Sequence, residues 1–173
     1  MLNISSDKTE YNVGDEVKLS IPSGKEGKAL ISLETGTKVL QTFWIDTKNG
    51  VTDYTFKVTD AMTPNIYVHA TLIQPHGNVM NDLPIRLYGV LPLMIKDEKT
   101  VLKPKITCAD SWRPETEVEV KVSEEQGKEM AYTLAIVDEG LLDITRFKTP
   151  DPWSTFYAKE ALGVKTWDIF DMI

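Results

Sequence analysis

The sequence has one cysteine and two histidines among its 173 residues. A lone cysteine, Cys108, cannot form an internal disulfide bond, and it lies in a strand-like stretch where a small buried side chain is expected. His69 and His76 have no cysteine pair near them, so their spacing fits no zinc site. The sequence therefore predicts no metal ligands and no cofactor-binding residues.

Long apolar runs and an excess of positive charge are also missing. No stretch reaches the roughly 18 to 20 apolar residues of a membrane-spanning helix, and no signal segment opens the chain. Lys and Arg number 19 against 26 Asp and Glu, which gives a net charge of −7. Such a surface repels nucleic-acid phosphates. We therefore expect no nucleic-acid partner and no membrane insertion by this chain.

Catalytic motifs are absent too. Neither histidine accompanies a Gly-x-Ser-x-Gly nucleophile motif, and Gly24, Gly27 and Gly36 form no phosphate-binding loop. The neighbouring acids Asp138 and Glu139 would point to opposite faces of an extended chain, so we interpret them as part of a turn. The sequence predicts no catalytic residues and no enzyme.

The sequence is rich in short alternating apolar segments separated by turn residues, which is typical of an antiparallel β-sandwich. Asn49-Gly50 favours a tight hairpin, and Pro84 and Pro92 indicate an edge strand or a strand next to the linker. The predicted strands are residues 17–21, 29–33, 39–45, 51–58, 65–73, 83–93 and 132–137. The core faces of two of them are expected to hold Tyr54, Phe56 and Val58, and Ile66, Val68, Ala70 and Leu72.

A repeat at long period predicts two domains. The pattern of residue types in residues 11–19 (Tyr-Asn-Val-Gly-Asp-Glu-Val-Lys-Leu) recurs in residues 112–120 (Trp-Arg-Pro-Glu-Thr-Glu-Val-Glu-Val). An aromatic residue, a turn and an alternating strand recurring at this spacing indicate two consecutive sandwiches of about 100 residues each. The charged stretch at 96–99 suits a linker. We therefore expect a complete sandwich at residues 1–96 and a partial one at residues 97–173.

One short helix is expected near the C-terminus. Asp151 can cap it, Pro152 suits its first position, and Gly163 ends it. Trp153 and Phe156 would share one face of this helix. Aromatic residues placed in this way are expected to pack against their own domain.

The sequence around this helix resembles a known family. The following segments are similar to those that precede the bait region in bacterial alpha-2-macroglobulins: residues 132–142 (Tyr-Thr-Leu-Ala-Ile-Val-Asp-Glu-Gly-Leu-Leu), 147–153 (Phe-Lys-Thr-Pro-Asp-Pro-Trp), 156–157 (Phe-Tyr) and 161–168 (Ala-Leu-Gly-Val-Lys-Thr-Trp-Asp). Residues 11–15 and 62–68 resemble strand and turn signatures of macroglobulin domains in the same family.

The resemblance implies an all-β fold of tandem macroglobulin-type sandwiches, of the immunoglobulin or fibronectin kind, in a broad-spectrum endopeptidase inhibitor. In this family a protease cuts an exposed bait segment, and the macroglobulin domains rearrange to enclose the protease. The chain would end just before the bait and would have no activity alone. Its partners would be target proteases, through the full-length parent, and neighbouring macroglobulin domains.

The resemblance also implies a location and a limit on chemistry. Bacterial inhibitors of this family are periplasmic or attached to the cell envelope, often through a lipid anchor. The covalent arm of the family mechanism needs a Cys-Gly-Glu-Gln thioester motif. Cys108 is followed by Ala109 and Asp110, so this segment does not carry that motif.

A second interpretation is a carbohydrate- or surface-binding pair of sandwiches from an adhesin or a polysaccharide-utilisation protein. Trp44, Trp112, Trp153 or Trp167 would then form an exposed stacking platform. Aromatic exposure separates the two interpretations. A sugar platform needs coplanar exposed rings, whereas the inhibitor predicts that Trp153 and Phe156 pack against the sandwich.

Overall fold

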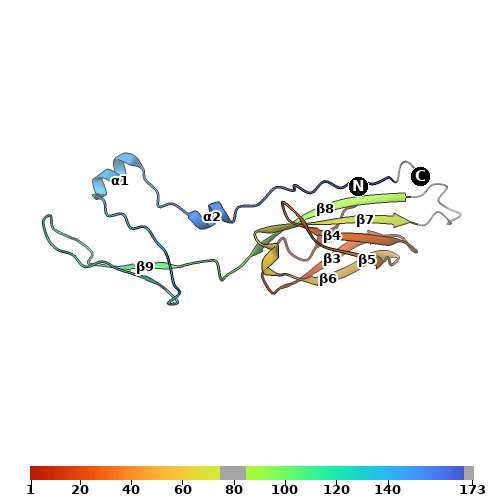
Figure 1. Cartoon of the computed structure of the whole chain (residues 1–173), viewed down its shortest axis with the longest axis horizontal. Coiled ribbons are helices and arrows are strands. Elements are labelled where there is room, and N and C mark those ends of the chain that lie inside the picture. Colours follow the sequence, from red (N-terminus) through yellow and green to blue (C-terminus); the bar gives the residue numbers. More distant parts are fainter. Residues whose placement is uncertain (75–84, 170–173) are drawn as a thin grey trace. The chain divides into compact units, whose positions relative to one another are not determined.

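The computed structural model of the chain describes residues 1–74 and 85–169. They form two compact units (Figure 1). The first unit is Met1–Glu98 together with the stretch that begins at Tyr157, and the second unit is Lys99–Phe156. The predicted boundary between residues 96 and 97 stays a prediction, and residues 157–169 belong to the first unit.

The first unit is a sandwich of two β-sheets (Figure 1). One sheet has the order β1-β3-β6 and the other has the order β2-β8-β7-β4-β5, and every pair is antiparallel except β2 with β8. The elements are β1 (Ser5–Ser6), β2 (Glu10–Asn12), β3 (Glu16–Ser23), β4 (Lys28–Glu34), β5 (Val39–Asp46), β6 (Gly50–Lys57), the 3-10 turn Asp60–Met62, β7 (Asn65–Gln74) and β8 (Ile85–Lys96). The all-β prediction is confirmed.

Alternating side chains build the core between the two sheets. In β3 and β7 every second residue is buried, as the period of a β-strand requires. Ile31 on β4 lies between Phe43 of β5 and Ala70 of β7. Every buried hydrophobic residue of the described chain lies between Leu2 and Ile95. The predicted core residues of the strand at 65–73 are confirmed, as are Phe56 and Val58, whereas Tyr54 is only partly buried.

The predicted hairpin at Asn49-Gly50 is wrong, because the two flanking strands belong to different sheets. β5 pairs with β4 and β6 pairs with β3, so the turn carries the chain from one sheet to the other. Gly50 does adopt a positive φ of 94°. Phe43 stacks on Tyr54 across the gap between the sheets, with ring centroids 4.5 Å apart. The turn residues predicted the reversal of the chain but not the pairing of its strands.

β8 is not an edge strand, but it is the strand next to the predicted linker, since it ends at Lys96. It pairs with β7 along its length and with β2 at its last three residues. The amide of Met94 donates to Thr9, and the next amide, that of Ile95, donates to Pro64 on the β7 side. Because amide direction alternates along a strand, the missing amide of Pro92 faces the β2 side, and the β7 pairing stays intact. Leu83 and Pro84 lie outside the described residues.

The second unit contains little regular structure. β9 (Pro104–Thr107) and β10 (Lys121–Glu124) form an antiparallel hairpin, and two short helices follow, α1 (Glu139–Thr145) and α2 (Pro152–Phe156). The predicted strand at residues 132–137 is absent, and residues 112–120 contain no strand, although they repeat the pattern of β2 and β3. Trp112 is 37% exposed, whereas its counterpart Tyr11 is 2% exposed.

Both helices depart in part from the expectations. Asp138 is not a turn residue but the N-cap of α1, where its carboxylate accepts from the amide of Gly140 at 2.9 Å. Asp151 does cap α2, because its Oδ1 accepts from the amide of Ser154 at 3.0 Å. α2 nevertheless ends at Phe156, seven residues before Gly163. The residues beyond it take an extended path on the surface of the sandwich.

Replacement of Ile31 by alanine tests the core. Because Ile31 is fully buried, Ile31→Ala is expected to lower the free energy of unfolding by about 2–5 kcal/mol. Val39→Ala, at a position that is 45% exposed, should change it by no more than about 0.5 kcal/mol. Urea unfolding followed by circular dichroism measures both. Equal effects of the two substitutions would contradict this description of the core.

A second prediction concerns pH. The hydroxyl of Tyr11 donates to Asp7 Oδ1 at 2.7 Å, and the amide of Lys18 donates to the same atom at 2.9 Å. These two hydrogen bonds hold the pKa of Asp7 below its usual value. The charged carboxylate therefore stabilises the folded state at neutral pH, and this contribution is lost as the pH falls through the lowered pKa.

Asp7→Asn is accordingly expected to destabilise the chain at pH 7. The difference from the wild type should shrink below about pH 4, as the carboxylate becomes protonated first in the unfolded chain and, at lower pH, in the folded chain. Urea titrations at a series of pH values from 7 to 2 measure this difference. A gap that stays constant over the whole series would show that the charge of Asp7 does not contribute.

Candidate functional site

An extended segment, residues 157–169, crosses the outer face of the five-stranded sheet, and we call it the strap. It has no regular secondary structure. Figure 1 shows it in dark blue alongside β7 and β8. Asn65, Tyr67 and His69 of β7 alternate with the buried core residues of that strand, so their side chains point to the opposite, outer face. All three contact the strap.

Asn65 holds the backbone of the strap. Its side-chain Nδ2 donates to the carbonyl oxygen of Glu160 at 3.2 Å, and its Oδ1 accepts from the amide of the same residue at 2.7 Å. The hydroxyl of Tyr67 donates to that carbonyl at 2.8 Å. Asn65 is fully buried. One amide side chain thus satisfies both backbone groups of one residue, as a neighbouring strand would.

Two glycines allow the strap to approach the sandwich. A Cβ atom on Gly163 would collide with the carbonyl oxygen of Gly36, and a Cβ on Gly36 would lie 3.0 Å from the carbonyl oxygen of Ala161. Both positions therefore require glycine for close contact between backbones. Gly36 belongs to no phosphate-binding motif, and in the structure it has this packing role.

Polar side chains hold the far end of the strap. Thr166 Oγ1 lies 3.3 Å from His69 Nδ1, and the same nitrogen lies 3.8 Å from Glu34 Oε1. Arg86 Nη1 pairs with Asp168 Oδ1. The side chains of His69 and Glu34 are 13% and 4% exposed, so this is a largely buried polar group.

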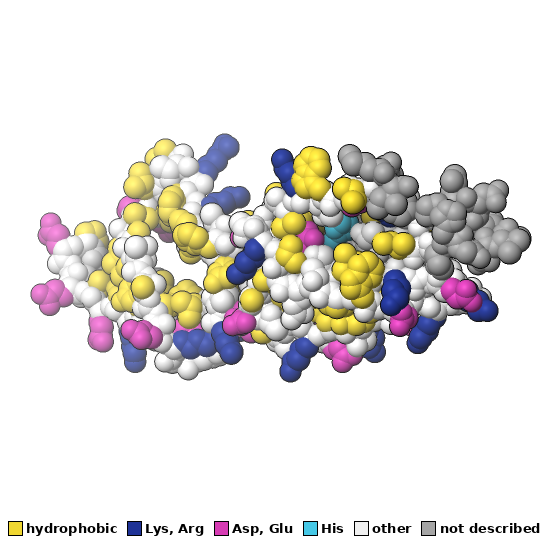
Figure 2. All heavy atoms as spheres, turned by 45° about the vertical axis from the view of Figure 1, so that its right-hand side comes forward, with side chains coloured by type: hydrophobic (Ala, Val, Ile, Leu, Met, Phe, Trp, Pro, Cys, Tyr) yellow, Lys and Arg dark blue, Asp and Glu magenta, His cyan; other side chains and the backbone are white. Residues whose placement is uncertain are grey.

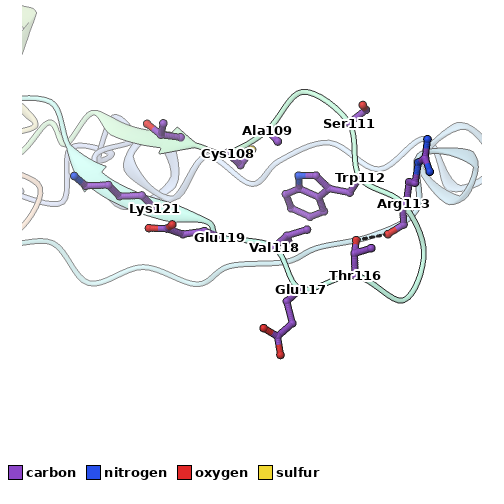
Figure 3. Close-up of a pocket in the computed structure, with 11 residues that line it drawn as sticks. Cys108, Ala109, Ser111, Trp112, Arg113, Thr116, Glu117, Val118, Glu119 and Lys121 are labelled. Atoms are coloured by element: carbon purple, nitrogen blue, oxygen red, sulfur yellow. Dashed lines mark hydrogen bonds between the residues drawn. The ribbon is translucent and has the colours of Figure 1, made fainter.

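The second unit contains an open hollow between β9, the following loop and β10 (Figure 3). The indole of Trp112 points into it, towards Cys108 and Val118, while Glu117 points away. Thr116 Oγ1 donates to the carbonyl of Arg113 at 2.7 Å and closes the loop. The hollow has no convergent set of polar side chains of the kind that a small-molecule site needs.

Cys108 is exposed, so the prediction of a buried side chain is wrong. It follows β9, whose four residues are all exposed. Hydrophobic side chains are visible on the surface of this unit in Figure 2. The larger ones with an exposure of 40% or more are Leu102, Ile106, Val118, Tyr132, Leu134, Ile136, Val137, Leu141, Ile144, Phe147 and Phe156.

The aromatic residues whose exposure separates the inhibitor from the carbohydrate-binding interpretation differ in how deeply they are buried. Trp153 is partly buried and donates its Nε1 to Thr100 Oγ1 at 2.9 Å. Phe156 is 82% exposed, so the prediction that it packs against the sandwich is wrong. α2 stops at this residue and presents no continuous apolar face. Trp44 and Trp167 are 55% and 85% exposed.

The structure describes residues 1–74 and 85–169. Within those ranges, no group of three or more His, Cys, Asp or Glu side chains could hold a metal ion. No helix of the same residues is long and apolar enough to cross a membrane. His76 lies outside the described residues, and the prediction that the chain has no catalytic or metal-binding residue stays a prediction.

Glu124 holds the loop next to the β9–β10 hairpin. Its carboxylate accepts from the backbone amides of Lys128 at 3.0 Å, Lys103 at 3.2 Å and Gln126 at 2.7 Å. These bonds, that from Lys128 first, hold the pKa of Glu124 below its usual value, although burial acts in the opposite direction. One side chain thus holds together the two chain segments at the open end of the hairpin.

Glu124→Gln is expected to loosen this hairpin. A neutral amide offers a single acceptor oxygen, so at least one of the three backbone amides loses its partner. Hydrogen exchange of the Lys103 and Lys128 amides should speed up about tenfold. Glu125→Gln is the matched control, because the side chain of Glu125 makes an exposed ion pair with Lys103 at 3.7 Å, and its backbone bond to Lys103 is unaffected by the substitution. Similar exchange in both variants would contradict the assigned role.

Comparison with known proteins gives the family. The model of the alpha-2-macroglobulin bait region domain matches residues 2–144. The alpha-2-macroglobulin of Escherichia coli K12 is 28% identical over 178 residues, which cover 99% of this chain and 11% of that protein. The alpha-2-macroglobulin of Xylella fastidiosa 9a5c is 30% identical and matches 99% of this chain with 10% of its own length.

Two solved structures of the Escherichia coli protein are also similar. Its native conformation, determined by cryo-EM, matches 94% of this chain with a TM-score of 0.55 and 25% identity. The crystal structure of its trypsin-activated form matches 94% with a TM-score of 0.52 and the same identity. The chain covers about a tenth of each of these relatives. On the match of the bait region domain over most of its length, the chain belongs to the alpha-2-macroglobulin family.

Proposed function

We propose that this chain is a structural part of a bacterial broad-spectrum endopeptidase inhibitor that traps proteases after bait cleavage. The observation that carries the proposal is the match of the bait region domain over residues 2–144. The similar Escherichia coli protein has a trypsin-activated form, which supports a protease as the partner. The relatives also favour this function over the carbohydrate-binding alternative, which relies on exposed tryptophans.

In this proposal the two parts of the chain have different tasks. The sandwich supplies a rigid body, because its buried hydrophobic residues form one continuous cluster. Residues 97–173 would be a partial macroglobulin-like sandwich that leads to the bait. The exposed hydrophobic side chains between Leu102 and Phe156 support this, since a finished sandwich buries such residues.

The chain itself would be no enzyme and would need no cofactor. Its partners would be target proteases, reached through the full-length protein, and the neighbouring macroglobulin domains. We propose a periplasmic or cell-envelope location, with a lipid anchor in the parent. Family membership supports these points, since the relatives are bacterial alpha-2-macroglobulins.

Limited proteolysis tests the proposal. The full-length protein is treated briefly with several proteases of different specificity, and the cleavage sites are mapped by mass spectrometry. We expect all proteases to cut within one short stretch beyond Ile173, because a bait must be extended and exposed. The sandwich should resist them, since its amides belong to two hydrogen-bonded sheets. After cleavage the protein should become more compact and retain the protease.

The control is the same protein with that stretch replaced by a Gly-Ser linker that lacks side chains for most proteases. It should neither compact nor retain protease. Scattered cleavage at many loops, or a protein that is cut in one stretch but releases the protease unchanged, would contradict the trap.

A further inference from the structure

We propose that the outer face of the five-stranded sheet is a docking site for an extended peptide, occupied here by the chain's own strap. The strap binds there and detaches as one unit while the sandwich stays folded. The inference rests on the contacts of residues 1–98 and 157–169 and does not depend on the protease trap.

The sandwich does not need the strap for its core. All buried hydrophobic residues among those described come from the stretch between Leu2 and Ile95. The strap adds none: its Leu162, Trp167 and Ile169 are 39%, 85% and 63% exposed, and its Tyr157 and Val164 are only half-buried. Detachment would therefore cost the sandwich little of the apolar burial that stabilises folded proteins.

The site recognises a polypeptide backbone. Asn65 and Tyr67 make three hydrogen bonds to the amide and carbonyl of one residue, Glu160. Backbone groups are common to all peptides, so these bonds hold a chain without selecting its side chains. Selection comes from the close contact of Gly36 with Gly163, which admits only a residue without a Cβ atom.

Side-chain contacts then set the register of the strap. Thr166 meets His69 in the middle of β7, and Asp168 pairs with Arg86, which lies opposite Ile73 near the other end of β7 from the Asn65 contact. Contacts at both ends, with the glycine between them, define one alignment along the strand. An occupant shifted by one residue would place a side chain against Gly36.

Both the docked and the detached states are chemically acceptable. Asn65, Glu34 and His69 are polar, so water can replace the strap when it leaves. Docking must also close the loop formed by residues 99–156, which opposes it with an entropy cost that grows with loop length. The hydrogen bonds and the ion pair favour docking, and the entropy of loop closure opposes it. Two opposing contributions of this kind are expected of a reversible contact.

The test uses the full 173-residue chain and two matched variants of the strap. Gly163→Val places a branched side chain against the Gly36 carbonyl, while Lys165→Val introduces the same residue at an exposed position two residues later. The reporter is the amide proton of Glu160, which donates to Asn65. Its exchange with deuterium is followed by NMR, together with that of the Ile31 amide in β4.

We expect Gly163→Val to speed exchange of the Glu160 amide at least about tenfold and to leave the Ile31 amide unchanged. Lys165→Val should change neither. Unchanged Glu160 exchange in Gly163→Val would overturn the docking site. Equal acceleration of both amides would show that strap and sandwich unfold together, which also overturns the proposal. Tyr67→Phe, which removes one bond to Glu160, should give a smaller acceleration in the same direction.

A second measurement supplies the strap as a separate peptide. The Gly163→Val chain, with its site vacated, is titrated with a synthetic peptide of residues 157–169 and with the same peptide carrying valine at position 163. The native peptide should shift the NMR signals of Asn65, Tyr67 and His69 in a saturable way, and the valine peptide should not. Equal binding of both peptides, or of neither, would contradict the site.

Discussion

The two faces of β7 constrain the whole first unit. Because side chains alternate along a strand, residues such as Ile66 and Val68 fill the core while Asn65 and Tyr67 face outward. β7 is also central in its sheet, paired with β4 and β8 on its two sides. A shift of one residue in its register would expose the core and remove the strap contacts together. The position of the strap therefore depends on the same pairing that holds the sandwich.

The inner and outer faces of β7 are held by different kinds of interaction. Apolar burial on the inner face stabilises the fold strongly and is not directional. The outer face instead relies on directional hydrogen bonds and on close contact between glycines. This difference lets one part of the chain stay rigid while another can move. A protein that rearranges after a local cut needs both properties. In our proposal the sandwich supplies the first and the strap the second.

Sequence patterns predicted the strands of the first unit well because burial on one face leaves a period of two, but the strand predicted at residues 132–137 is absent. They could not predict which strands pair, and so the turn at Asn49-Gly50 was assigned to a hairpin. The strap could not be predicted either, since Asn65 and Glu160 are 95 residues apart. An outward-facing polar residue is normally exposed to water, and only the structure shows that Asn65 is buried. The prediction that Cys108 is buried was wrong for the opposite reason, because this residue follows β9, whose four residues are all exposed.

The most direct test of this account is native-state hydrogen exchange of the wild-type chain at increasing urea concentration. The account predicts that the Glu160 amide exchanges through a small opening that depends little on urea, because little surface is exposed when the strap detaches. The Ile31 amide should exchange only through global unfolding, with a steep dependence on urea. If both amides share the same steep dependence, the strap and the core form one cooperative unit and the account is wrong.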